Sequence, residues 1–154
     1  QVDAGVNALQ LFDSWAGLLS GDDFQQWIIN PTKQITDALK IYAPDIPIIG
    51  FARDSQDELI NYYNQTKVNA LGLSQELDLQ WVNQSISGDI VVQGNLDPQI
   101  LLQGGTKMLA AAQRICDSFE HRPYVFNLGH GIIKETPIDH VSQLVDFIRS
   151  REEK

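Results

Sequence analysis

The sequence has 154 residues, close to the length of one domain and enough to bury a substantial core. Hydrophobic residues make up 43% and charged residues 20%, proportions that exclude a disordered or fibrous chain. A net charge of −9, from 11 Lys and Arg against 20 Asp and Glu, argues against duplex nucleic acid as a partner. No apolar run approaches the roughly 20 residues of a membrane span, and the single cysteine, Cys116, excludes an internal disulfide.

This low cysteine content favours a reducing, cytoplasmic location. Because the chain starts at Gln1 rather than at a methionine, we expect it to be part of a longer protein.

Five short apolar segments, each followed by a polar or glycine-rich turn, predict β-strands. They are Leu9–Phe12, Ile46–Ala52, Ala70–Leu73, Ile90–Gly94 and Tyr124–Leu128. Their cores are nearly continuous in apolar residues, a pattern typical of parallel strands that are covered on both faces.

Amphipathic stretches between these segments predict helices at 22–43, 56–66, 78–86, 98–102, 105–120 and 138–151. We expect Asn30-Pro31 to divide the first stretch into two helices, the second with Pro31 in its first turn. Ser55-Gln-Asp-Glu58 has the spacing of a capping box, and Asp97 and Thr136 are candidate N-caps. The alternation of strands and helices predicts an α/β fold with about five parallel strands joined by crossover helices.

In α/β proteins, ligand-binding groups gather at the carboxyl ends of the strands. His130 follows the fifth predicted strand and lies between Gly129 and Gly131, which would allow a sharp turn and the close approach of a ligand. An imidazole at that position can donate a hydrogen bond to an anionic oxygen. A purely structural histidine in a tight turn is the alternative. His121 and His140 are placed on helices and are weaker candidates.

Ser14 follows the first predicted strand, where its hydroxyl could bind a carboxylate or phosphate or could serve as a turn residue. Arg53 follows the second strand and could meet an acidic ligand or pair with Asp54 or Asp57. Asn95 belongs to a polar turn expected after the fourth strand and could shape a cleft. The sequence contains no Gly-x-Gly-x-x-Gly, no Walker A loop and no spacing of ligands suited to zinc.

Three stretches resemble the C-terminal part of the uroporphyrinogen decarboxylase family: LQLFDSWAG (9–17), VVQGNLDP (91–98) and NLGHGIIKETPIDHV (127–141). The resemblance implies that residues 1–154 form the C-terminal part of a single TIM-type (β/α)8 barrel domain whose N-terminal part is absent. It also implies a cytoplasmic homodimer that removes carbon dioxide from the four acetate side chains of uroporphyrinogen III, without a metal or organic cofactor.

By the same resemblance, Ser14 and His130 match the substrate-contacting Ser and His of the family. We expect both side chains to face one shared mouth. The catalytic Asp, an arginine-rich loop and a substrate Tyr of the family belong to the preceding part, so no catalytic residue is expected here and the isolated chain should be inactive.

Two alternatives remain open at this stage. A corrinoid-dependent methyltransferase of related fold would need a His-x-Cys zinc site, whereas His130 is followed by Gly131. A non-catalytic α/β binding module is the other.

Overall fold

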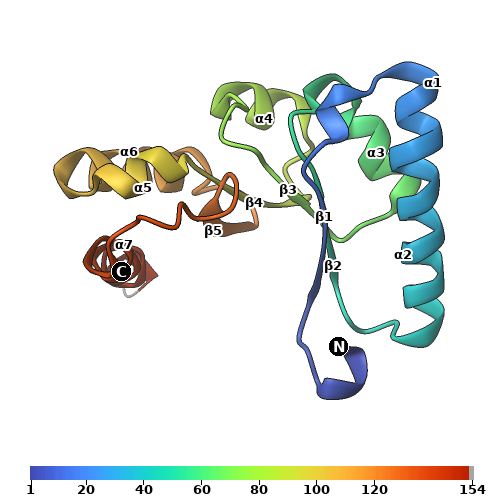
Figure 1. The fold of residues 1–154 in the computed structure, drawn as a ribbon, viewed down its shortest axis with the longest axis horizontal. Helices are drawn as coiled ribbons and strands as arrows, with labels where there is room; N and C mark the ends of the chain where they lie inside the picture. The colour runs from blue at the N-terminus through green and yellow to red at the C-terminus, as the bar shows by residue number, and fades with distance from the viewer. Residues whose placement is uncertain (153–154) are drawn as a thin grey trace. The chain divides into compact units, whose positions relative to one another are not determined.

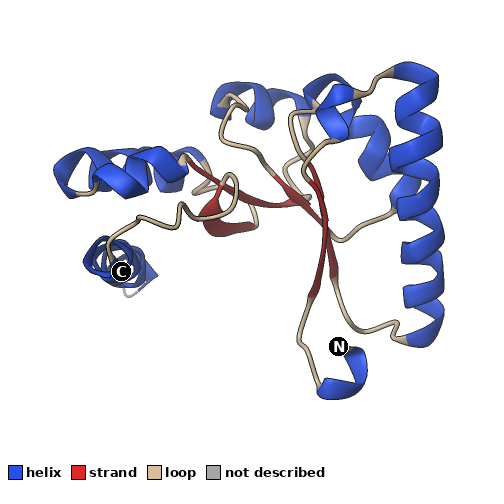
Figure 2. Ribbon diagram, viewed as in Figure 1, coloured by secondary structure: helices blue, strands red, loops and turns tan. Residues whose placement is uncertain are grey.

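The computed structural model describes residues 1–152. Five parallel strands form one sheet in which neighbours follow chain order, β1-β2-β3-β4-β5. The strands are β1 (Leu9–Asp13), β2 (Ile48–Ala52), β3 (Ala70–Gly72), β4 (Val91–Leu96) and β5 (Tyr124–Leu128). Helices alternate with them along the chain (Figures 1 and 2). The predicted α/β class, with parallel strands and crossover helices, is confirmed, and the arrangement agrees with part of a (β/α)8 barrel.

The helices are α1 (Gly21–Phe24), α2 (Asn30–Tyr42), α3 (Leu59–Thr66), α4 (Leu79–Ser85), α5 (Pro98–Gln103), α6 (Gly105–Ser118) and α7 (Ile138–Glu152). Shorter helical turns cover Val2–Ala4, Ala16–Leu18, Gln25–Ile29 and Gln56–Glu58. The chain forms two compact units: residues 1–73 with 90–92, and residues 74–89 with the chain from Gln93 onward.

The first unit buries both faces of β2, which pairs with β1 in parallel register from Leu9↔Ile48 to Asp13↔Ala52. Gly50 on one face is covered by Tyr62 of α3, so closely that a Cβ at position 50 would lie 2.7 Å from the phenol oxygen. On the other face, Phe51 lies over Gly72 of β3 in the same way. A Cβ at position 72 would lie 2.8 Å from the ring of Phe51. Two glycines thus let aromatic rings seat directly on the sheet.

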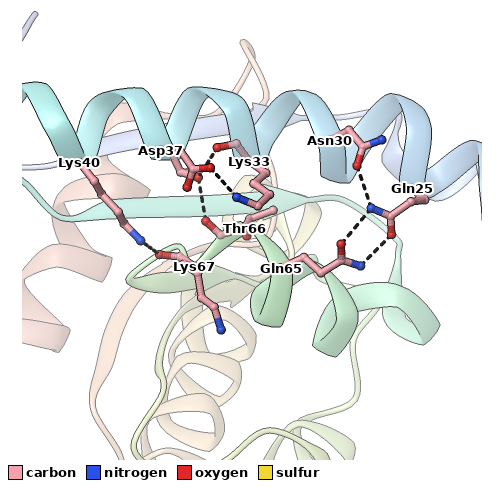
Figure 3. A network of polar contacts seen from close by, with 9 residues as sticks. Gln25, Asn30, Lys33, Asp37, Lys40, Gln65, Thr66 and Lys67 are labelled. Carbon is pink, nitrogen blue, oxygen red and sulfur yellow. Dashed lines mark hydrogen bonds and ion pairs between the residues drawn. The ribbon is translucent and has the colours of Figure 1, made fainter.

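Polar contacts fix helix α2 and the turn before it to α3 (Figure 3). The side-chain amides of Gln25 and Gln65 donate to each other, over 3.0 and 2.7 Å. Lys40 donates to the main-chain oxygen of Lys67, which ends α3 in a left-handed conformation. The buried hydroxyl of Thr36 donates to the carbonyl of Thr66 over 2.7 Å. The contacts of Lys40 and Thr36 satisfy carbonyls at the end of α3 that have no partner within the helix.

In the second unit, helix α6 turns one apolar stripe inward. Met108, Ala112 and Ile115 are buried and recur at the spacing of a helix face. Leu144 is the buried residue of α7 that continues this core. The ring of Tyr124 on β5 lies 4.9 Å from that of Phe119, between ring centroids.

The predicted break at Asn30-Pro31 takes a different form from two separate helices. Gln25–Ile29 is a π-helical turn that joins α1 to α2, with Pro31 in the first turn of α2 as expected. Proline lacks an N–H and its ring crowds the carbonyl four residues earlier, so a wider turn before it keeps the chain helical.

Two predicted caps are wrong, whereas a third is confirmed. The hydroxyl of Ser55 donates back to the carbonyl of Ala52 over 2.7 Å, and Glu58 instead accepts from the N–H of Gly21 over 3.0 Å. The buried hydroxyl of Thr136 has no hydrogen-bond partner among residues 1–152 and therefore does not cap α7. Asp97 does cap α5, accepting from the N–H of Gln99 over 2.8 Å.

The expectation that all five strands are covered on both faces is wrong for the two outer ones. Phe12 on β1 is 71% exposed and Val125 on β5 is 47% exposed. Each of these strands has only one neighbouring strand within residues 1–152, so fewer side chains lie over it. The inner strands β2, β3 and β4 are almost entirely buried.

Candidate functional site

Ser14 and Arg53 lie at the same end of the sheet in the first unit. Ser14 follows Asp13, the last residue of β1, and Arg53 follows Ala52, the last residue of β2. Asp13 and Ala52 are register partners in the pairing of the two strands. The N–H of Arg53 donates to the carbonyl of Asp13 over 3.0 Å, so the pairing of the two strands continues into the turn. The structure therefore brings two of the four predicted site residues together at neighbouring carboxyl ends.

The turn that carries Ser14 is held against the turn that carries Arg53. The N–H of Gly17 donates to the carbonyl of Arg53 over 2.9 Å. A Cβ at position 17 would lie 2.3 Å from the carbonyl oxygen of Asp54, a distance that real Cβ atoms do not reach. Asp54 itself adopts a left-handed conformation with φ of 55°. Glycine at position 17 is thus required by the close approach of the two backbones.

Arg53 is half-buried, and its Nε lies 3.1 Å from Oδ2 of Asp54. The ion pair with Asp54 that the sequence left open is present. It does not exclude a ligand, because one carboxylate oxygen occupies only one side of the guanidinium fork.

His130 and Asn95 lie at the corresponding strand ends of the second unit. His130 is exposed and falls in the bend that follows β5. The N–H of Gly129 donates to the carbonyl of Leu96, the last residue of β4, over 2.8 Å. This hydrogen bond fixes the bend to the neighbouring strand, and His130 is the next residue after the donor.

The chain bends sharply at Gly129 and His130, as the flanking glycines predicted. Neither glycine adopts a positive φ. A Cβ at Gly129 would lie 2.2 Å from the main-chain nitrogen of Gln75, whereas a Cβ at Gly131 would meet nothing within 4 Å. Gly129 permits close contact between two backbones, and the approach of a ligand beside Gly131 stays a prediction.

Asn95 lies within β4, not in a turn after it, and its side chain is 5% exposed. The strand continues to Leu96 because the amide of Asn95 finds partners inside the protein. Its Nδ2 donates to the carbonyls of Ser74 and Leu77, both over 3.0 Å. Asn95 thereby fixes the turn after β3, the same turn that contacts Gly129.

A cavity of about 750 Å³ lies beside Asn95 in the second unit. Its lining comes from the turn after β3, helix α4, the end of β4 and helix α6, and it includes Gln75, Asp97 and Arg114. His130 is not part of this lining. Asn95 lines this cavity, with its amide donor already used by the protein, and its part in a ligand-binding cleft stays a prediction.

Two tyrosines near these elements, the buried Tyr62 and the half-buried Tyr124, are held in the neutral form. Burial raises the pKa of Tyr62 to about 12. Burial likewise raises the pKa of Tyr124, whose hydroxyl donates to the carbonyl of Gly94. Both phenols therefore remain protonated near neutral pH.

No group of three or more His, Cys, Asp or Glu side chains within residues 1–152 is arranged to hold a metal ion. Burial raises the pKa of the Cys116 thiol on α6, which keeps it protonated and unsuited to ligation. His140 is engaged with the carbonyl of Leu101 over 3.1 Å, and His121 lies in the turn after α6 rather than on a helix. None of the helices in the described part of the chain is long and apolar enough to cross a membrane.

Parallel strands with polar side chains at their carboxyl ends define an α/β protein of the class that binds small ligands at one end of its sheet. The family model described as "Uroporphyrinogen decarboxylase (URO-D)" matches residues 1–151, and the chain belongs to this family.

Curated relatives carry the same name. Proteins named uroporphyrinogen decarboxylase from Sphingopyxis alaskensis and Rhizorhabdus wittichii are 45% and 44% identical to this chain over 149 residues. A third, from Rhodospirillum rubrum, is 39% identical over 150 residues. Each match covers 97% of this chain but only 43–44% of the relative, so the chain spans less than half the length of these proteins.

The common mouth expected for Ser14 and His130 stays a prediction. Sequence reasoning missed the roles of Gly17 and Gly129, both of which stand inside the motifs that it singled out. A glycine in a motif signals a special backbone position, but the residue that approaches it comes from a distant part of the chain.

Proposed function

We propose that this chain is the C-terminal part of a uroporphyrinogen decarboxylase and contributes one side of a substrate-binding barrel. The proposal rests above all on the match to relatives of that name along 97% of the chain. Residues 1–154 would form the last five strands of a single (β/α)8 domain. A complete barrel typically has about 250 residues, which leaves three strands to a preceding part.

The reaction converts each acetate side chain of uroporphyrinogen III to a methyl group, giving coproporphyrinogen III. Protonation of the pyrrole ring creates an electron sink. The bond between the methylene carbon and the carboxylate then breaks, carbon dioxide leaves, and its bonding electrons enter the ring. A proton added to the methylene carbon completes the methyl group, and loss of the ring proton restores the pyrrole.

The residues of this chain would bind and orient the substrate. Ser14 and His130 offer hydroxyl and imidazole donors to acetate or propionate oxygens at strand ends. An Asp supplied by the preceding part would stabilise the pyrrole cation. Because the chain carries a net charge of −9, attraction of a polycarboxylate must come from groups close to the cleft.

We further propose that the complete protein is a cytoplasmic homodimer whose partner molecule is this tetrapyrrole, with no metal or organic cofactor. The chemistry supports the last point, since the substrate provides its own electron sink. Light scattering on the purified complete protein tests the dimer, and a mass corresponding to one subunit would contradict it.

The decisive experiment expresses the complete reading frame that encodes this chain and incubates the purified protein anaerobically with uroporphyrinogen III. Chromatography should detect coproporphyrinogen III. Residues 1–154 alone, assayed at the same concentration, should give little or no product because the groups assigned to the preceding part are missing. The absence of product from the complete protein would refute the proposed function.

A further inference from the structure

The side chain of Arg53 stands out among the charged groups of the first unit. A guanidinium carries five N–H donors. None of the five makes a hydrogen bond to the protein within residues 1–152, and the buried Nε is among the donors without a partner. The approach to Asp54 Oδ2, at 3.1 Å, is an ion pair without the alignment of a hydrogen bond.

This state is unusual for the buried Nε, whereas the terminal nitrogens of the guanidinium are open to water. Donors removed from water normally find an acceptor, and an exception calls for a ligand or a functional role. By contrast, the main chain of Arg53 is fully engaged, since its N–H binds Asp13 and its carbonyl binds Gly17. The structure therefore fixes the backbone of this residue and leaves its charged head without a hydrogen-bonded protein acceptor.

The location of Arg53 indicates what such an acceptor would be. Arg53 follows β2 and Ser14 follows β1, and adjacent strands of a sheet lie about 4.8 Å apart. A hydroxyl and a guanidinium at neighbouring strand ends suit a carboxylate, which a guanidinium binds through two parallel N–H···O bonds. Asp54 supplies one negative charge beside Arg53 and leaves the remaining donors to a second acid.

We propose that Arg53 is a substrate-binding residue that holds a carboxylate of the tetrapyrrole next to Ser14. This assignment rests on the proposed function and deepens it, because it places a cation for the polycarboxylate within this chain. Asp54 acts as a positioning residue that restrains the guanidinium from the Nε side.

The test compares Arg53→Gln, Arg53→Lys and Lys67→Gln in the complete protein. Lys67 is exposed and lies between α3 and the start of β3, so its substitution removes one positive charge at the opposite, amino end of the strands of the same unit. Two measurements are made: KM and kcat for uroporphyrinogen III, and the dissociation constant of uroporphyrin, a fluorescent oxidised form that retains the carboxylates. Circular dichroism and thermal unfolding identify variants that fail to fold.

Arg53→Gln should raise KM and the uroporphyrin dissociation constant about 10- to 100-fold, the effect of losing a charged hydrogen-bonding group. The change in kcat should be smaller than threefold. Arg53→Lys keeps the charge without the planar fork and should recover part of the affinity. Lys67→Gln should match the wild type in both measurements.

Unchanged affinity in a folded Arg53→Gln protein would overturn the inference while leaving the decarboxylase function intact. Unchanged affinity with a large loss of thermal stability would show that a protein carboxylate, not the substrate, pairs with Arg53. The third outcome is a complete protein that binds uroporphyrin in a way that depends on Arg53 and yet shows no turnover. That result would support the binding role of Arg53 and refute the decarboxylase function. If Arg53→Gln does not fold, Arg53→Lys provides the test. Wild-type affinity in Arg53→Lys would refute the claim that the guanidinium binds a substrate carboxylate through two N–H groups.

Discussion

Replacing Gly129 by alanine should destabilise the protein, whereas the same change two residues later should not. At Gly129 the added methyl group would lie 2.2 Å from the main-chain nitrogen of Gln75 and 2.7 Å from both its Cα and Cβ. Ordinary carbon contacts begin near 3.5 Å, so one of the two backbones must move by more than 1 Å. Neither segment is a flexible side chain that could rotate away.

Overpacking of this kind costs about 1–3 kcal/mol. Because the shift also pulls on the hydrogen bond from Gly129 to Leu96, we expect the upper part of that range. Gly131 provides the matched control, since its methyl group would meet nothing within 4 Å and its backbone has no positive φ. There, alanine reduces the freedom of the unfolded chain and should stabilise by about 0.4–1 kcal/mol.

The assay is denaturant unfolding of the complete protein carrying Gly129→Ala or Gly131→Ala, followed by KM measurements on both. The two free energies of unfolding should differ by about 2–4 kcal/mol, the sum of the opposite effects. Only Gly129→Ala should also raise KM, because it displaces the bend that carries His130. Equal stabilities for the two variants would refute the argument that backbone contact with Gln75 fixes this bend.

Three further outcomes follow from the same structure. Asn95→Leu should cost about 1–3 kcal/mol of unfolding free energy because it removes two hydrogen bonds and leaves the carbonyl of Leu77 without a donor, while that of Ser74 still accepts from the N–H of Leu77. Loss of the exposed amide in Asn83→Ala should cost less than about 0.5 kcal/mol, and similar losses in the two variants would contradict the structural role of Asn95. Ser14→Ala and His130→Asn should each raise KM for uroporphyrinogen III about tenfold. The midpoint of thermal unfolding should stay within about 3 °C of the wild type in both variants. An unchanged KM in both would show that Ser14 and His130 do not belong to the substrate site. Burial raises the pKa of Tyr62 to about 12, so the folded state binds the phenol proton more tightly than the unfolded state does. The free energy of unfolding of the wild type should therefore fall by up to about 2–3 kcal/mol as pH rises from 10 to 12. Tyr62→Phe should lose less stability over that interval in parallel denaturant titrations, and identical pH profiles would show that the phenol is not shielded.

Within each unit, predicted site residues lie on or beside strand-end turns that are locked to their neighbours by backbone contacts. Gly17 meets Asp54 in the first unit, and Gly129 meets Gln75 in the second. In both cases the glycine lies within three residues of a predicted substrate-binding side chain. Rigid support of this kind favours precise placement of a donor at small entropic cost on binding.

Local sequence determined which segments became strands and helices. All five predicted strands are present, because apolar segments rich in β-forming residues and bounded by polar turns favour extended chain. The motifs also placed Ser14, Arg53 and His130 directly after strand ends, since strand boundaries follow from a local pattern. Asp97 could be recognised as a cap because its partner is only two residues away.

Tertiary structure decided everything that depends on a distant partner. Ser55 and Thr136 have the spacing of caps but make other contacts or none, and the polar residue Asn95 stays inside a strand because two carbonyls from another turn accept its amide protons. The same holds for Gly129, whose need for a missing Cβ is set by Gln75, 54 positions earlier in the chain. Sequence pattern encodes what a residue can do with its near neighbours, whereas burial and backbone contact arise only when remote segments meet.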